Sequence, residues 1–169
     1  GHFLRESMAF LPSLLDFCAV DLFFTRAGRE VAARYRVGPV KHERCETFCE
    51  NDYSSSHLIY FSSGRYRALV IAPATSNTVA KCALGIADSL ASNFFAQAGK
   101  SSVPAFVLPT DTTLAMTSTT PSGREIPIRP RPIDLSHAET LTTMQGVRVL
   151  QSPGRPLYTY SPAGGTDQR

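Results

Sequence analysis

Short apolar runs alternate with longer segments of helical spacing along most of the chain. The predicted strands are the apolar runs at 19–25, 68–72, 103–108 and 147–150. The predicted helices span 3–17, 29–36, 77–99 and 136–144. Alternating strands and helices are typical of a parallel sheet that is covered by helices on both faces. We therefore predict an α/β fold with a doubly wound parallel sheet.

Single residues refine the predicted helices. Pro12 should kink or divide the first helix, because proline lacks a backbone donor and crowds the preceding turn. Gly85 should separate two helices within 77–99. Ser136 should cap the last helix, with Glu139 at the capping-box position.

Three other parts of the chain lack such periodicity. Residues 37–67 are polar and irregular, which indicates a functional flap, unrecognised local structure or an unresolved stretch. Residues 112–132 are rich in Pro, Thr and Arg and should form an extended arm, of a kind that often crosses to a neighbouring subunit. Residues 151–169 should be a tail. We expect residues 1–169 to form one domain, because the 43% of hydrophobic residues suffice for one core.

Small polar residues follow three of the predicted strands, at 25–28, 73–78 and 109–111. In a parallel sheet these turns share one edge, where ligands bind in open α/β folds. The N–H groups at a helix start are unpaired and favour an anion or a polar ring edge. The alternative is that residues 75–78 only cap a helix, but a cap needs one polar residue and this turn has four. A second polar turn follows at 87–89.

Charge and composition exclude several kinds of partner. The net charge is +3, aromatic residues make up 9%, and no stripe of basic and aromatic residues is present, so we expect no nucleic-acid partner. Polar residues interrupt the longest apolar region, 8–24, which is therefore not a membrane span, and no signal peptide precedes it. The four cysteines match no disulfide or metal pattern. We expect a cytoplasmic protein without a metal site.

The turns at the sheet edge favour a ligand of mononucleotide size. They lack the GxGxxG turn of dinucleotide-binding proteins and the GxxxxGK(S/T) turn of nucleotide hydrolases. Hydroxyl and amide groups with few charges suit one phosphate and a ring edge. A flavin fits this description, because backbone N–H and C=O groups tune its ring without an ionised side chain.

Several motifs resemble one family of proteins. PATSNTVAK at 73–81 and GIADSL at 85–90 closely resemble the signature of the homo-oligomeric flavin-containing (PASANT-type) flavoproteins, which include cysteine decarboxylases. Further motifs resemble one branch of this family, the archaeoflavoproteins and dihydromethanopterin reductases. These motifs are GHFLRES at 1–7, TRAG at 25–28, GRY at 64–66 and VPAFVLPTD at 103–111.

The resemblance implies a three-layer Rossmann-like (flavodoxin-like) subunit that binds FMN, often at a subunit contact in trimer-based homo-oligomers. It also implies a first strand before Gly1. The positions that match the family's cofactor-binding motifs are Gly1, His2, Thr25, Ala27, Ala74, Thr75, Asn77, Asp88, Ser89, Pro109, Thr110 and Asp111. The first four would lie at the phosphate end, and Ala74, Thr75 and Asn77 against the ring or the ribityl chain.

The segment after the third strand distinguishes the activities of the family. The decarboxylases carry a PxMNxxMW clamp where this chain reads PTDTTL at 109–114, which disfavours decarboxylation. Many archaeal relatives carry iron–sulfur cysteines after this turn, whereas residues 112–169 contain no cysteine, so an external donor must supply electrons. The resemblance thus implies an FMN-dependent reductase that transfers hydride to a pterin, from dihydromethanopterin to tetrahydromethanopterin. The alternatives are a flavin-dependent cysteine decarboxylase and a non-enzymatic flavin electron-transfer or regulatory subunit.

His57 is the candidate catalytic residue, since the decarboxylases use a histidine at a comparable place before the PASANT strand. A histidine titrates near pH ~6.5 and can donate a proton to a pterin nitrogen. The alternative for His57 is an exposed loop position. His2, beside the flavin site, is the second candidate among the histidines, and we expect it to bind the flavin rather than to donate a proton.

Overall fold

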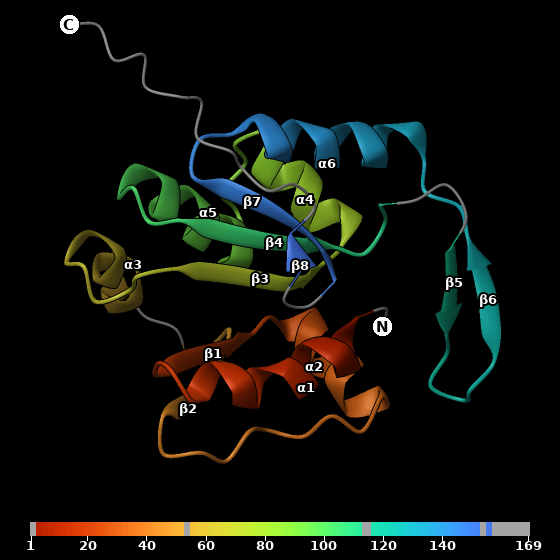
Figure 1. Cartoon of the computed structure of the whole chain (residues 1–169), viewed down its shortest axis with the longest axis horizontal. Helices are drawn as coiled ribbons and strands as arrows, with labels where there is room; N and C mark the ends of the chain where they lie inside the picture. Colours follow the sequence, from red (N-terminus) through yellow and green to blue (C-terminus); the bar gives the residue numbers. More distant parts are fainter. Residues whose placement is uncertain (1–2, 53–54, 113–115, 153–154, 157–169) are drawn as a thin grey trace, which may run out of the picture.

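A computed structural model of the protein describes residues 3–52, 55–112, 116–152 and 155–156. The helices are α1 (Leu4–Leu15), α2 (Arg26–Arg34), α3 (Ser55–Ser62), α4 (Ser76–Ala83), α5 (Leu90–Lys100) and α6 (Pro132–Thr143). The strands are β1 (Val20–Phe24), β2 (Cys45–Cys49), β3 (Leu69–Ala74), β4 (Ala105–Pro109), β5 (Met116–Thr119), β6 (Glu125–Ile128), β7 (Val147–Ser152) and β8 (Arg155–Pro156). The predicted α/β class is confirmed (Figure 1).

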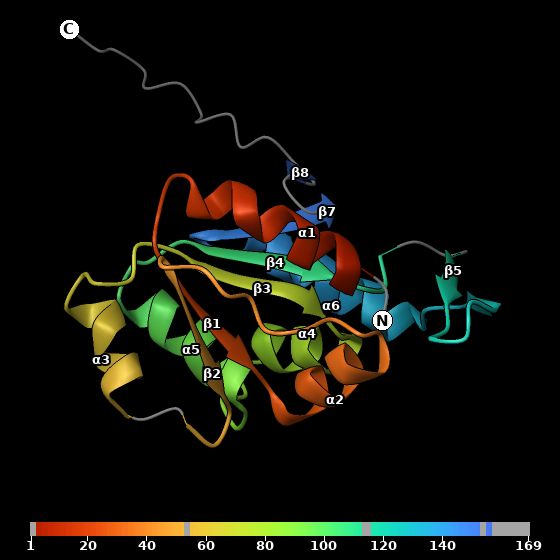
Figure 2. The same cartoon turned by 90° about the horizontal axis from the view of Figure 1, so that it is seen from below.

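The larger sheet has the order β3–β4–β7–β8, and its first three strands are parallel. In the central strand, Val107 lies opposite Ile71 of β3 and Val149 of β7. Val107 and Leu108 are fully buried, as expected of an apolar strand with both faces covered. Helix α1 covers one face of this sheet, and α4 and α5 cover the other (Figure 2). The three layers place the carboxyl ends of β3 and β4 at one edge.

A second parallel sheet is formed by β1 and β2, with Val20 opposite Cys45 and Phe24 opposite Cys49. Within the described residues β1 is not hydrogen-bonded to β3, so the parallel strands are divided between two sheets. Aromatic rings connect the two units: the Phe23 ring of β1 lies 4.9 Å from the Phe94 ring of α5, measured between centroids. The strand expected before Gly1 concerns residues outside the described ranges.

The structure corrects several predicted boundaries. The region expected to be irregular contains β2 and α3, which confirms unrecognised local structure among the three alternatives. Helix α2 begins at Arg26 rather than Arg29, because Thr25 is its cap. Helix α6 begins at Pro132, where proline suits the first turn, and Asp134 completes the capping box. Ser136 is therefore inside α6 and does not cap it.

Two other expectations concern Pro12 and the arm. Helix α1 continues through Pro12 without division. The arm at 112–132 contains an antiparallel hairpin of β5 and β6 that projects from the body (Figure 1). Residues 113–115 of the arm lie outside the described ranges, as does most of the tail.

Gly85, with φ of 73°, separates α4 from α5 as predicted.

Among the described residues, none of the helices combines the length and the apolar character that a membrane span requires. In the same ranges no three His, Cys, Asp or Glu side chains lie together as metal ligands.

Tyr66 ties the two sheets together by a hydrogen bond. Its hydroxyl, in the segment before β3, donates to Asp21 Oδ2 of β1 over 2.7 Å. Burial and this carboxylate raise the pKa of Tyr66 above its ordinary value. A tyrosine whose pKa is raised by folding stabilises the fold below its unfolded pKa of about 10, and the contribution is lost as the pH rises beyond that value.

The variant Tyr66→Phe is expected to lower the free energy of unfolding by about 1 to 2 kcal/mol at neutral pH, because it removes a partly buried hydrogen bond to a carboxylate. Urea denaturation measures this loss. The companion variant Tyr60→Phe retains the ring contacts and serves as a control, since the Tyr60 hydroxyl has no bond to Asp21. Equal stability of the two variants would contradict a role for the Tyr66–Asp21 bond.

Candidate functional site

The turns after β3 and β4 are joined by hydrogen bonds at the carboxyl edge of the larger sheet. The Thr110 N–H donates to the Ala74 carbonyl oxygen over 2.9 Å. The Ser76 hydroxyl donates to Asp111 Oδ2, and the Thr110 hydroxyl donates to the same oxygen over 3.0 Å. The Asp111 carboxylate therefore holds the exit of β4 against the start of α4.

The start of α4 offers unused donors beside this contact. Thr75 caps the helix, because its hydroxyl accepts the Thr78 N–H over 3.4 Å. Capping explains Thr75 but not its neighbours: Ser76 binds Asp111, and the exposed Asn77 side chain has no partner among the described contacts. The N–H groups of Ser76 and Asn77 precede the first intrahelical bond and carry the positive end of the helix dipole. These donors fit one edge of a flavin or a phosphate, and no cationic side chain is needed.

The turn after β1 is organised in a similar way but has an additional acceptor. The Thr25 hydroxyl caps α2 by accepting the Gly28 N–H over 3.0 Å, and a Cβ at Gly28 would lie 3.0 Å from that hydroxyl. The Arg26 N–H donates to Glu50 Oε2 over 2.7 Å. A carboxylate thus occupies the start of α2, where a phosphate would otherwise be favoured. Ala27 is exposed beside it.

Both α2 and the start of α4 lie toward the end of the molecule to which β3 runs (Figures 1 and 2). No described contact joins Thr25 or Ala27 to Thr75 or Asp111. Glu50 was not predicted, because it lies in the region that the sequence pattern left irregular.

Two predicted binding positions are core residues. Ala74 is 1% exposed, and Pro109 is among the fully buried side chains. Ala74 reaches the edge through its carbonyl oxygen, which is already bound to Thr110. The two residues position the turns that follow them.

Asp88 and Ser89 lie at the far end of α4 from the edge. Eight helical residues separate the two turns, which is roughly 12 Å of helix. Asp88 Oδ1 pairs with Lys81 Nζ over 2.8 Å, and Ser89 caps α5 together with Ser92. The structure does not bring these two residues together with Asn77 or Asp111 of the same chain.

His57 lies on α3 and is 9% exposed, so the expected alternative of an exposed loop histidine is wrong. The centroid of its ring lies 5.1 Å from that of Phe23, 4.8 Å from that of Phe48 and 5.6 Å from that of Tyr60. Helix α3 lies beside the start of β3 (Figure 1), whereas Thr75 follows the end of that strand. The structure therefore does not place His57 at the carboxyl edge.

Gly1 and His2, the remaining predicted residues, lie outside the described ranges.

Comparison with known proteins gives the same family as the sequence motifs. Residues 11–164 match the model of the family described as Flavoprotein. The chain is similar to dihydromethanopterin reductases (acceptor) of Methanocaldococcus jannaschii and Methanosarcina mazei, with 38% identity over 122 residues in both cases. These matches cover 66% of this chain and 50% and 51% of the relatives. The chain thus spans about half the length of these two relatives.

One solved structure resembles the chain along most of its length. It is Burkholderia xenovorans DmrB in complex with FMN, described as a cubic protein cage for redox transfer. The superposition has a TM-score of 0.74 at 35% sequence identity, and it covers 90% of this chain and 83% of DmrB.

Proposed function

Because the chain belongs to the flavoprotein family, we propose that it binds FMN at the carboxyl edge of β3 and β4 and acts as an FMN-dependent reductase of a pterin. The observation that carries the proposal is the 38% identity to two dihydromethanopterin reductases, together with the FMN complex of DmrB. The proposed reaction converts dihydromethanopterin to tetrahydromethanopterin, with electrons from an external donor. Each relative is about twice as long as the matched part, so the substrate is part of the proposal.

The residues at the carboxyl edge suit the binding of FMN. Asn77 and the N–H groups at the start of α4 would hold the ring or the ribityl chain, and Thr110 and Asp111 would close the site. FMN, when bound, supplies hydride transfer to the pterin. The role of this chain is to orient the two reactants and to exclude water. Thr25 and Ala27 would approach the phosphate.

The proposed site includes a contribution from a second copy of the chain. Asp88 and Ser89 lie at the other end of α4 from Asn77, and we propose that they contact the FMN bound by a neighbouring copy. The description of DmrB as a cage supports a homo-oligomer. His57 packs among aromatic rings away from this edge, which supports a role in packing rather than in proton donation.

A second candidate function is a flavin electron carrier without a small substrate. The observation that favours it is the β5–β6 hairpin, which projects from the body and is attached to it where the Tyr35 hydroxyl donates to the Thr119 carbonyl oxygen over 2.8 Å (Figure 1). We propose that this hairpin offers a surface to a protein partner. Cysteine decarboxylation has no such support, because the segment at 109–114 lacks the methionine clamp of the decarboxylases.

The variant Asn77→Ala is expected to weaken FMN binding about three- to tenfold, because it removes one neutral hydrogen bond to the ligand. Asn77 is exposed and has no partner among the described residues, so the fold is expected to be unaffected. Fluorescence titration of the apoprotein with FMN measures the dissociation constant. The exposed Asn51, which follows β2, provides the control Asn51→Ala. Asn77→Ala with the affinity of this control would remove Asn77 from the site.

The variant Glu50→Gln is expected to strengthen FMN binding up to about fivefold, because it removes a negative charge from the start of α2, where the phosphate is proposed to bind. The same titration tests this, with the exposed Glu43→Gln as the charge-matched control. If both variants bind FMN equally, the phosphate does not lie at the start of α2.

A further inference from the structure

The two faces of the larger sheet are covered unequally. On one face, Val107 of the central strand lies in the core that α4 and α5 cover. Successive residues of a strand point to opposite faces, so Phe106 points to the other face. Its neighbours in the strand register are Val70 of β3 and Arg148 of β7. These three residues, Val70, Phe106 and Arg148, form a row across the sheet, which we call the open row.

The open row is exposed where a parallel sheet is normally covered. Val70 is 50% exposed, Arg148 is exposed and Phe106 is partly exposed. Two positions further along β4 and β7, on the same face, Leu108 and Leu150 are buried. Helix α1 packs on this face along β3, and Figure 1 shows none of the described helices in front of the first halves of β4 and β7. Because parallel sheets bury both faces, the open row indicates an interaction surface.

Charges of opposite sign lie at the two ends of this surface. Arg148 is at the β7 end of the open row. The exposed Asp16 is at the β3 end, because it follows α1, which packs along β3 and ends on the side of the molecule where β3 begins (Figures 1 and 2). Arg44 Nη1 donates to the backbone oxygen of Asp16 over 3.4 Å, and no described cation pairs with the Asp16 carboxylate. The apolar Val70 and Phe106 lie between the two charges.

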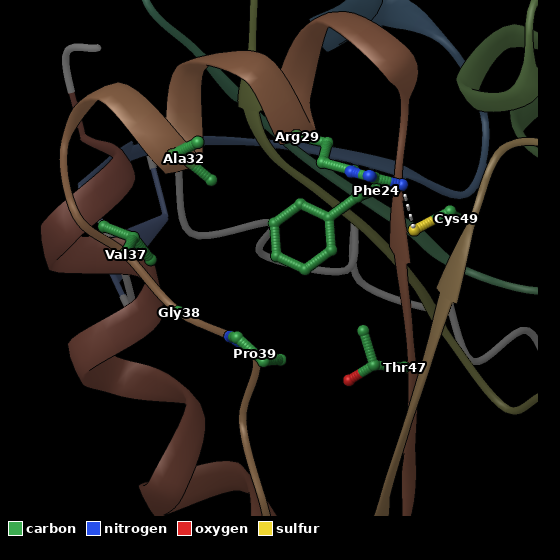
Figure 3. Close-up of a pocket in the computed structure, with 9 residues that line it drawn as sticks. Phe24, Arg29, Ala32, Val37, Gly38, Pro39, Thr47 and Cys49 are labelled. Carbon is green, nitrogen blue, oxygen red and sulfur yellow. Dashed lines mark hydrogen bonds between the residues drawn. The ribbon is translucent and has the colours of Figure 1, made fainter.

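The Arg148 side chain differs from other exposed arginines, which have partners in their own chain. Arg29 lines a cavity of about 280 Å³ between α2 and the β1–β2 sheet, and its Nη1 lies 3.5 Å from Cys49 Sγ (Figure 3). Arg131 pairs with Asp134 over 2.7 Å. Among the described residues no ion pair involves the Arg148 guanidinium. It is therefore available to a carboxylate of a second molecule.

The open row and its flanking charges are complementary to themselves. A two-fold axis that runs parallel to the strands, above the middle of the row, brings the same face of a second copy against it. Arg148 of each copy then lies opposite Asp16 of the other, because the axis exchanges the two ends of the row. The apolar residues of the two rows meet in the middle, as in two aligned sheets that pack face to face. A second copy thus offers both the opposite charges and the apolar surface, which is the property of an isologous interface.

We propose that the open row and Asp16 form a two-fold interface between two copies of this chain. Phe106 and Val70 pack on the same residues of the other copy, and each Arg148 pairs with Asp16 across the interface. Asp88, which is proposed to contact the FMN of a neighbouring copy, lies between α4 and α5, the helices of the opposite face. The two contacts therefore do not compete, and together they join copies into an assembly larger than either contact forms alone.

Sedimentation velocity of the full chain, with and without FMN, tests the proposal. The wild type is expected as an assembly of two or more copies. Arg148→Glu and Asp16→Arg should each lower the particle mass to half or less, because each places like charges opposite one another. The double variant restores opposite charges and should regain the wild-type mass. Arg34→Glu reverses an exposed charge on α2, outside the proposed interface, and should keep the wild-type mass.

Other outcomes would overturn the proposal. A monomeric wild type would do so, as would a wild-type mass in both single variants or a double variant that stays dissociated although circular dichroism shows it folded. Assembly that appears only after removal of residues 157–169 would assign the surface to those residues instead.

FMN titration separates this interface from the proposed flavin site. The FMN affinity of Arg148→Glu should stay within about twofold of the wild type. A large loss of FMN affinity together with the loss of mass would overturn the separation of the two contacts. A chain that binds no FMN but shows the expected masses would support this interface and contradict the flavin site.

Discussion

Replacing Asp111 with alanine is expected to weaken FMN binding by at least about tenfold. One oxygen of this carboxylate accepts the hydroxyls of Ser76 and Thr110, so the variant releases the turn after β4 from the start of α4. Hydrogen bonds to a charged group contribute about 1.5 to 3 kcal/mol each, and their loss disorders the donors proposed for FMN. Fluorescence titration with FMN gives the affinity, and circular dichroism shows whether the fold is retained.

Controls distinguish this effect from a general loss of charge. Asp16→Ala removes an exposed carboxylate at the end of α1, and we expect its FMN affinity to equal that of the wild type. Ser76→Ala should lose part of the same affinity, and the double variant with Asp111→Ala should lose less than the sum. Wild-type FMN affinity in Asp111→Ala would show that this carboxylate does not organise the site.

The second large effect concerns the fold. Phe94→Ala is expected to lower the free energy of unfolding by about 3 to 5 kcal/mol, as is typical of a buried phenylalanine. Phe94 is 4% exposed, and its ring contacts Phe23 of β1 at 4.9 Å and Phe61 of α3 at 5.5 Å. The variant therefore weakens both the core and the link between the two sheets. Urea denaturation measures the change.

Phe17→Ala provides the matched control, because Phe17 is 88% exposed. We expect it to change the free energy of unfolding by less than about 0.5 kcal/mol. A small effect of Phe94→Ala, comparable with that control, would mean that the aromatic cluster does not hold the β1–β2 sheet to the larger one.

The elements that were predictable from the sequence are those with a strong local pattern. The strands β3 and β4 are apolar runs bounded by polar turns, and Gly85 marks the break between α4 and α5. Strand β2 was missed because its five residues, CETFC, include two polar positions and are stabilised by pairing with β1. Short elements of this kind depend on tertiary partners more than on propensity.

The site was predictable only in part, for a similar reason. The order of strands and turns along the chain correctly predicts that the turns after β3 and β4 lie at one edge of the sheet. The contacts of Ser76 with Asp111 and of Arg26 with Glu50 depend on which segments meet in space, which spacing along the chain does not specify. The burial of His57 likewise follows from rings on β1 and β2, whose pairing was not predicted.

The most direct test of the reductase proposal is a single-turnover experiment without oxygen. The protein is loaded with FMN, reduced, and mixed with dihydromethanopterin while the visible absorbance of the flavin is followed. The proposal predicts that the absorbance of oxidised FMN returns and that one tetrahydromethanopterin forms for each flavin. Reduced FMN that is stable toward the pterin but is reoxidised by a redox protein would contradict the reductase and support an electron carrier.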